Sequence, residues 1–245
     1  MMIVRRFAAG FAGCLRGAEP ELTFRRIKPP AHQGSKPMNI TAIQTRGAEV
    51  VSALNRAATM ASRLQMPADV PDRWRVAWAL LRAALDDAFA IAVLLHDHGP
   101  ELAGSALTLL RPMNEKFKRG TWFGFCATDE QTQDFIENDR VPKRNLAGQI
   151  ELHEPFNQWP MFSELYQNAW RKFDSFTHGG NQIVGGYMMV HGVGAAFPEA
   201  DLLRVLDHVE GVGINAVHVM GMIAGNMGPD LARAVLADLE AEFAP

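Results

Sequence analysis

The fold is decided by residues 72–97, which read DRWRVAWALLRAALDDAFAIAVLLHD. Large apolar side chains recur here three or four positions apart, which is the spacing of one face of an α-helix. They form one stripe of Trp74, Trp78, Leu81, Leu85, Phe89 and Ala92, and a second set widens it, namely Leu80, Ala84, Val93 and Leu94. A helix that is apolar over most of its circumference lies in the interior of a helical protein. We therefore predict a long central helix over residues 72–97.

Helical patterns lie on both sides of this segment. The further helices are predicted over residues 40–64, 101–126, 128–138, a short stretch after 142, 160–178, 198–224 and 229–243. Pro112 should kink or divide the second of these. Thr128 and Gln131 have the spacing of a capping box, which marks a helix start. Because strand patterns are almost absent, the prediction is an all-α bundle of about seven or eight helices.

Residues 179–197 interrupt this pattern. They hold six glycines, at positions 179, 180, 185, 186, 192 and 194. Glycine clusters of this kind are typical of loops. We expect a loop or a mobile flap after a helix that ends at His178, with Gly179 and Gly180 as its stop.

Charge divides the chain into two parts. Residues 1–38 carry seven Lys and Arg and two acidic residues, and residues 39–245 carry 17 and 25, so the net charges are +5 and −8. Residues 19–38 hold four prolines and no apolar period. We expect residues 1–38 to be a disordered leader, or the result of a start codon placed too early, with Met38 as the true start. Residues 39–245 then form the helical bundle domain. Such an acidic body is no general nucleic-acid binder, so RNA contact requires a local basic patch or the leader.

Composition narrows the class of protein further. The two cysteines, Cys14 and Cys126, form neither a disulfide framework nor a metal-binding C-x-x-C motif, which suits a reducing cytosol. The most apolar helical stretch contains Arg82, Asp86 and Asp87, which are costly in lipid. The sequence indicates no metal site, no cofactor and no membrane or DNA partner, and we expect a cytoplasmic protein.

Charged residues on the apolar helices form a first candidate site. Two sets each share a helix face: Arg75, Arg82 and Asp86 on residues 72–97, and Arg111, Glu115 and Arg119 on residues 101–126. Isolated buried charges are costly, so these residues should be paired. One interpretation is a ligand-binding pocket in which Arg82, Arg111 and Arg119 bind an anion, with Asp86 and Glu115 beside them. The other is an ion network that fixes helix register.

Arg171, Asp174 and His178 form a second candidate site. Spacings of three and four put them on one stripe of the predicted helix over residues 160–178. Histidine in the last helical turn is favoured in its protonated form, and Asp174 can orient the ring. Arg171 can bind a phosphate, so the set suits general acid–base catalysis on a phosphodiester. The alternative is a histidine that caps the helix and bonds a carbonyl group.

Two segments carry a resemblance to known proteins. Residues 105–122, SALTLLRPMNEKFKRGTW, and residues 174–180, DSFTHGG, look like an uncharacterised family of bacterial helical proteins, and this resemblance spans most of residues 70–225. The chain is more loosely similar to HEPN domains, helical bundles whose active members carry an arginine, four to six residues and then a histidine. Six residues separate Arg171 from His178. The HEPN similarity implies metal-independent RNA cleavage in phage defence or toxin–antitoxin systems, with the paired residues contributed across a homodimer.

Three functions follow as hypotheses. The first is a HEPN-like endoribonuclease in which Arg171 binds the scissile phosphate, His178 is the general acid–base and Asp174 orients it. The second is a non-catalytic module that binds a small anion or nucleotide at the arginine seam. The third is an interaction protein whose charge network is architectural. An open pocket with unpaired arginines would favour the second, and a fully paired network with His178 buried against a carbonyl would favour the third.

Overall fold

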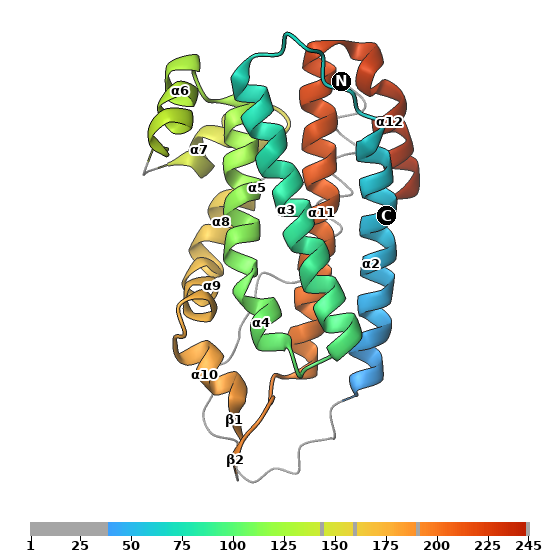
Figure 1. The fold of residues 1–245 in the computed structure, drawn as a ribbon, viewed down its shortest axis with the longest axis vertical. Coiled ribbons are helices and arrows are strands. Elements are labelled where there is room, and N and C mark those ends of the chain that lie inside the picture. The colour runs from blue at the N-terminus through green and yellow to red at the C-terminus, as the bar shows by residue number, and fades with distance from the viewer. Residues whose placement is uncertain (1–38, 143–144, 159–160, 190–191, 244–245) are drawn as a thin grey trace.

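The computed structural model of the chain describes residues 39–142, 145–158, 161–189 and 192–243, and the predicted leader over residues 1–38 lies outside this range. Four long helices lie side by side along the longest axis of the molecule (Figure 1): α2 (Ile40–Ser62), α3 (Asp72–His98), α5 (Leu110–Phe125) and α11 (Glu199–Met227). α3 packs against the other three, and α11 also packs against α2 and α5. The described part of the chain is therefore an all-α bundle, as predicted.

α3 is the central helix predicted for residues 72–97. Its buried side chains are Ala77, Leu81, Ala84, Leu85, Ala88, Ile91, Ala92 and Leu95. Small and large side chains alternate on this face, so neighbouring helices can interdigitate with it at close range. The helix begins after Pro71 and ends before Gly99, whose φ of +54° is one that only glycine adopts easily.

Pro112 lies just after the point where the predicted helix over residues 101–126 is divided. The chain forms α4 (Ala103–Thr108), breaks at Leu109 and continues as α5, in which Pro112 is the third residue. Backbone N–H groups in the first turn of a helix have no intrahelical acceptor, so proline sacrifices no hydrogen bond there. The predicted division is thus confirmed, and the break precedes the proline.

Short helices follow at the end of the bundle where α3 begins (Figure 1): α6 (Asp129–Asn138), α7 (Leu146–Ile150) and the 3₁₀ helix η1 (Phe156–Gln158). The capping box at α6 is confirmed. Gln131 N donates to Thr128 Oγ1 at 3.2 Å, and Thr128 N donates to Gln131 Oε1 at 3.0 Å.

α8 (Met161–Asn168) and α9 (Trp170–Thr177) replace the single helix predicted for residues 160–178. The division falls at Ala169, so the prediction of one continuous helix is wrong. Both helices lie on the outer side of α5 (Figure 1). α9 ends at Thr177, one residue before the predicted end, with His178 as its C-cap. The φ of Gly179 is +66°, so the predicted glycine stop is confirmed.

The glycine-rich segment is more ordered than its composition predicted. It forms α10 (Asn181–Tyr187) and a hairpin of β1 (Met188–Met189) with β2 (Gly192–Val193), so the expectation of a loop is wrong here. One cause is close packing, because a Cβ on Gly186 would lie 2.0 Å from Cε1 of Phe197. The absence of a side chain at Gly186 lets the ring of Phe197 pack against the backbone, and it does not make this segment a loop. Met188, Met189 and Val193 of the hairpin are exposed, and so is Val184 of α10.

α12 (Pro229–Glu242) follows α11 and packs against it, close to the predicted boundaries of the last helix. The described chain holds more helices than the seven or eight predicted. The breaks at Leu109 and Ala169 each divide one predicted helix, and the glycine-rich segment adds α10. Within the described ranges, no helix is both long and apolar enough to cross a membrane.

Candidate functional site

One arginine of α5 joins the two polar residues at the end of α9. Arg111 Nη1 lies 2.8 Å from Asp174 Oδ1 and donates a hydrogen bond to His178 Nε2 at 2.5 Å. The side chains of Arg111 and Asp174 are 32% and 40% exposed, and His178 is exposed. We call Arg111, Asp174 and His178 the α5–α9 cluster. It is an ion pair and a histidine that solvent can reach.

Apolar anchors hold α9 in place beneath this cluster. Phe173 and Phe176 are buried, and Thr177 Oγ1 donates to the carbonyl oxygen of Thr108 at 3.3 Å, which ties α9 to α4. The ring of Trp170 lies 5.6 Å from the Arg111 guanidinium. Cation–π contact with an aromatic face restrains the arginine as well as stabilising it. The position of Arg111 is thus fixed from three sides, by Trp170, Asp174 and His178.

The contact between Arg111 and His178 has one possible direction. A guanidinium has only donors, so Nε2 of His178 is the acceptor in this hydrogen bond. Oδ1 of Asp174 is closed off from solvent and receives no well-aligned hydrogen bond from the described residues, although Arg111 lies within ion-pair distance. The carboxylate holds the arginine by charge rather than by a directed hydrogen bond.

The structure redistributes the roles expected from sequence. Asp174 and His178 lie together, as predicted, but no side-chain hydrogen bond joins them in the described part of the chain, and Asp174 partners Arg111 instead. Arg171 is exposed on α9. Sequence reasoning assigned Arg111 to the other candidate site. Sixty-seven residues separate it from His178, so no local spacing could reveal the contact.

The other predicted site residues do not converge. Arg82 pairs with Asp86 at 3.0 Å on the surface of α3, where their side chains are 56% and 60% exposed. Arg119 pairs with Glu115 at 2.8 Å along α5. Arg82 and Arg119 each pair with a carboxylate of their own helix, and Arg111 contacts α9 instead. The predicted single network is therefore a set of separate ion pairs. The Arg82–Asp86 pair is not buried, contrary to what its apolar helix suggested.

Glu115 is the centre of a small basic group. Lys118 Nζ and Arg119 Nε lie 2.9 and 2.8 Å from its carboxylate. Partial burial raises the pKa of Glu115, but the two cations outweigh burial and leave that pKa below its ordinary value. Lys118 Nζ also lies 4.4 Å from the centroid of the Trp170 ring, so this group adjoins the α5–α9 cluster.

A polar pair that sequence reasoning missed lies next to the cluster. His208 Nε2 of α11 is 3.1 Å from Asn114 Oδ1 of α5, and Asn114 Nδ2 donates to the carbonyl oxygen of Leu110 at 2.7 Å. The His208 ring also contacts the ring of Phe173, with centroids 5.9 Å apart. Burial lowers the pKa of His208 to about 4, so the ring is neutral at pH 7. In the sequence, this pair could have been recognised because Asn114 and His208 are polar residues on otherwise apolar helix faces.

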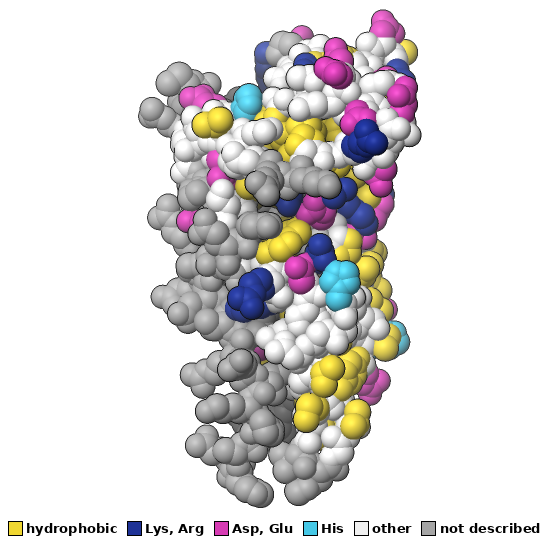
Figure 2. Space-filling model, turned by 90° about the vertical axis from the view of Figure 1, so that its left-hand side faces the viewer, with side chains coloured by type: hydrophobic (Ala, Val, Ile, Leu, Met, Phe, Trp, Pro, Cys, Tyr) yellow, Lys and Arg dark blue, Asp and Glu magenta, His cyan; other side chains and the backbone are white. Residues whose placement is uncertain are grey.

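Local charge sets this face apart from the rest of the body. α5 and α9 together carry six Lys and Arg and two acidic residues, whereas residues 39–245 are acidic overall. In the view that faces this side of the molecule, basic, acidic and histidine side chains gather near mid-height, and hydrophobic side chains gather toward the lower end (Figure 2). α5 and α9 thus carry a local excess of basic residues on an otherwise acidic body.

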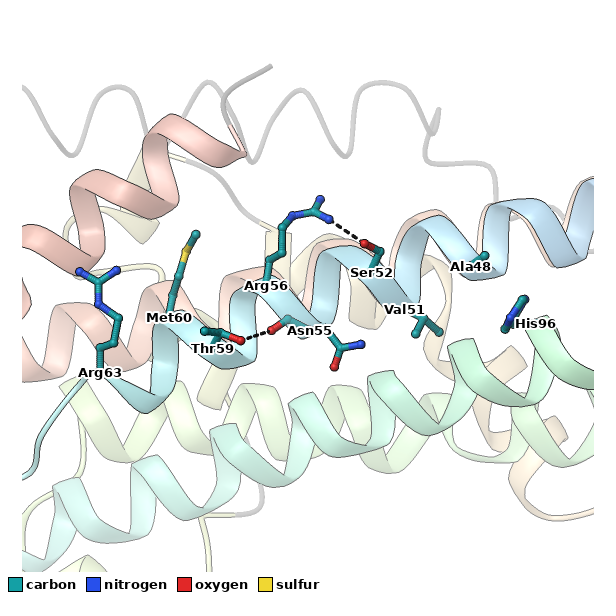
Figure 3. A pocket seen from close by; sticks show the side chains of 9 residues that line it. All are labelled: Ala48, Val51, Ser52, Asn55, Arg56, Thr59, Met60, Arg63 and His96. Atoms are coloured by element: carbon teal, nitrogen blue, oxygen red, sulfur yellow. Dashed lines mark hydrogen bonds between the residues drawn. The ribbon is translucent and has the colours of Figure 1, made fainter.

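A groove along the outer face of α2 is a weaker candidate. It has a volume of about 550 Å³, and its lining includes Arg56, Met60, Arg63 and, from α3, His96 (Figure 3). Arg56 pairs with Glu242 at 2.7 Å, and Arg63 pairs with Asp238 at 2.5 Å. Both arginines are thus already neutralised by α12. Arg111 of the α5–α9 cluster is also paired, with Asp174, but it contacts the ring nitrogen of His178 as well. Among the described residues of the groove, no arginine contacts a histidine in this way.

The described residues hold no group of three or more His, Cys, Asp or Glu that could bind a metal ion. Cys126 is partly buried, and burial raises the pKa of its thiol to about 11, so it is no thiolate nucleophile at pH 7.

Comparison with known proteins gives one match. Residues 81–244 match a family described as a family of unknown function, DUF6988. No curated protein and no solved structure matches the chain.

Proposed function

The chain belongs to the DUF6988 family, whose function is unknown, and we propose from the geometry that it is a metal-independent endoribonuclease with the α5–α9 cluster as its active site. One observation carries the proposal. A solvent-accessible histidine, His178, has its Nε2 within hydrogen-bond distance of the guanidinium of Arg111, which also pairs with Asp174. A base and a phosphate-binding cation are thereby within one hydrogen bond of each other.

The chemistry needs only groups that this face supplies. A phosphodiester that approaches Arg111 competes for its donors, and bidentate arginine–phosphate pairing is strong. As Arg111 turns to the phosphate, Nε2 of His178 becomes free to take the proton of the ribose 2′-hydroxyl. The 2′-oxygen attacks phosphorus, the bond to the 5′-oxygen breaks, and the imidazolium returns its proton to that oxygen. The products are a 2′,3′-cyclic phosphate and a 5′-hydroxyl.

Arg111 takes the role that sequence reasoning gave to Arg171. The arginine, the histidine and the carboxylate then come from a single chain, so the chemistry does not require residues from two copies. The HEPN-like relationship, its homodimer and its defence or toxin–antitoxin setting remain predictions. Light scattering of the purified full chain measures the oligomeric state directly.

The test is RNA cleavage by the purified full chain, with and without a chelator. We expect cleavage that survives the chelator, and a loss of about 10²- to 10⁴-fold in His178→Ala, which is the range for removal of a general acid–base. Arg111→Ala should lose activity as well. His98→Ala is the matched control, because His98 is also exposed and lies at the end of α3, outside the cluster.

Equal cleavage by His178→Ala and the wild type would assign the activity to a contaminant and reject the proposal. Absence of cleavage on every RNA tested would also reject it. Binding of an anion that is lost in Arg111→Ala would then identify a non-catalytic binding module at the same cluster.

A further inference from the structure

Arg171 stands apart from the other cations of the molecule. In the described part of the chain, it is the one Lys or Arg with neither an ion-pair partner, a ring contact nor another polar interaction. Even the neighbouring Lys172 lies in the field of Asp201, and Arg73 lies over the ring of Trp74 at 5.1 Å. An acidic body has carboxylates in excess, so a cation that none of them neutralises is notable.

Arg171 also shares a face with the cluster. It precedes His178 by seven residues, which is two helical turns and places both on the same side of α9. Two turns correspond to about 10 Å along the helix axis. In the proposed mechanism the scissile phosphate meets Arg111 and His178, so Arg171 is left free to meet a different phosphate of the same chain.

We propose that Arg171 binds a phosphate that flanks the scissile one, so that the substrate is an RNA chain of several nucleotides rather than a mononucleotide or a cyclic nucleotide. This inference rests on the proposed function only in taking the α5–α9 face as the place where RNA lies. Under this inference Arg171 increases the affinity for an RNA chain and takes no part in the chemical step. Phosphate contacts fix the position of a nucleic acid without reading its sequence, so no base preference follows from Arg171.

The experiment separates binding from cleavage. A fluorescent 12-nucleotide 2′-O-methyl RNA, which lacks the attacking hydroxyl, is titrated with the full chain at several salt concentrations. Arg171→Gln should weaken binding roughly fivefold to tenfold and lower the slope of log affinity against log salt by about one, since one phosphate contact is lost. Arg82→Gln is the matched control, because it removes an exposed arginine from α3, outside this face.

A second titration uses uridine 3′-monophosphate, which carries a single phosphate. Its affinity should be the same for the wild type and Arg171→Gln and should fall in Arg111→Ala. Equal affinity of Arg171→Gln and Arg82→Gln for the 12-mer would overturn the inference, and so would absence of 12-mer binding by the wild type. Arg171-dependent binding without cleavage of natural RNA would sustain this inference while rejecting the proposed nuclease.

Discussion

Two polar side chains of α11, His218 and Asn215, differ in their surroundings from two of α9, Asp174 and His178. In α11, His218 is buried with its Nδ1 3.2 Å from the carbonyl oxygen of Ile214, and Asn215 donates to Gly211 at 2.7 Å, so both are satisfied within their own helix. In α9, Asp174 and His178 both contact Arg111 of α5, and His178 is exposed while the side chain of Asp174 is 40% exposed. The histidine of this comparison is buried in α11 and open to solvent at the end of α9. The two histidines are the same residue type and differ in their burial and in the residues that they contact.

The largest expected effect tests whether α11 carries the stability of the bundle. Leu206 is fully buried on α11, so Leu206→Ala should lower the free energy of unfolding by roughly 2–5 kcal/mol through lost burial and the cavity left behind. Urea denaturation measures this. Leu152→Ala is the matched control, because that side chain is 80% exposed, and it should change stability by less than about 0.5 kcal/mol. Similar losses of unfolding free energy in both variants would show that the buried side chains of α11 do not contribute more to stability than exposed ones.

The buried histidine of α11 predicts a pH dependence. Burial lowers the pKa of His218 from 6.5 to about 4. Between these values the unfolded chain binds the proton and the folded one does not, so stability falls as pH drops from 6.5 toward 4 and is fully present above 6.5. The loss from this residue should reach roughly 2–3 kcal/mol near pH 4.

His218→Leu isolates this contribution. Denaturation of the variant and the wild type at pH 7.5 and 4.5 gives a difference in which His208, present in both, largely cancels. The variant should lose less stability on acidification. An identical loss in the two proteins would mean that His218 titrates normally and is not sealed in the core.

The ion pair of the cluster should contribute much less. Asp174→Asn removes one charge from a pair that is about one-third exposed on each side, so it should cost up to about 1 kcal/mol at low salt. The cost should shrink in 1 M salt, where charges are screened beyond about 3 Å. A loss of several kcal/mol that persists in high salt would instead place Asp174 among the residues that hold the bundle together.

The smallest expected effect is that of His178→Ala on stability. The ring is exposed, so the thermal unfolding midpoint should shift by no more than the equivalent of about 0.5 kcal/mol. This variant is also the one expected to lose RNA cleavage. A large fall in the midpoint would show that His178 has a structural role like that of His218, and the contrast between α9 and α11 would disappear.

Periodicity predicted the long helices because they bury continuous apolar faces. The boundaries of α3, α6 and α12 follow from Pro71, the Thr128 capping box and Pro229, which act locally. The break at Ala169 has no such local signal. Nor does α10, since its Gly186 makes room for the ring of Phe197, a tertiary contact that only the folded chain reveals.

The candidate site was predictable in part for the same reason. Asp174 and His178 are four residues apart on one helix, so their shared face follows from helical geometry. Arg111 meets them only because α9 packs beside α5, and that packing depends on Phe173 and Phe176 among many other contacts. Arg171 fitted the local pattern equally well. Spacing therefore predicted that Asp174 and His178 share a face, whereas the arginine that contacts them is determined by tertiary structure.

The shortness of α9 has a consequence for how the site exists in solution. A helix of eight residues does not persist by itself in water, so α9 is held by its docking onto α4 and α5 rather than by its own backbone. Undocking is then a sub-global opening that dismantles the α5–α9 cluster without unfolding the bundle. A ligand that contacts both Arg111 and α9 binds only the docked form and therefore stabilises it. Such a ligand should slow amide hydrogen exchange in residues 170–177 and leave exchange in α11 unchanged.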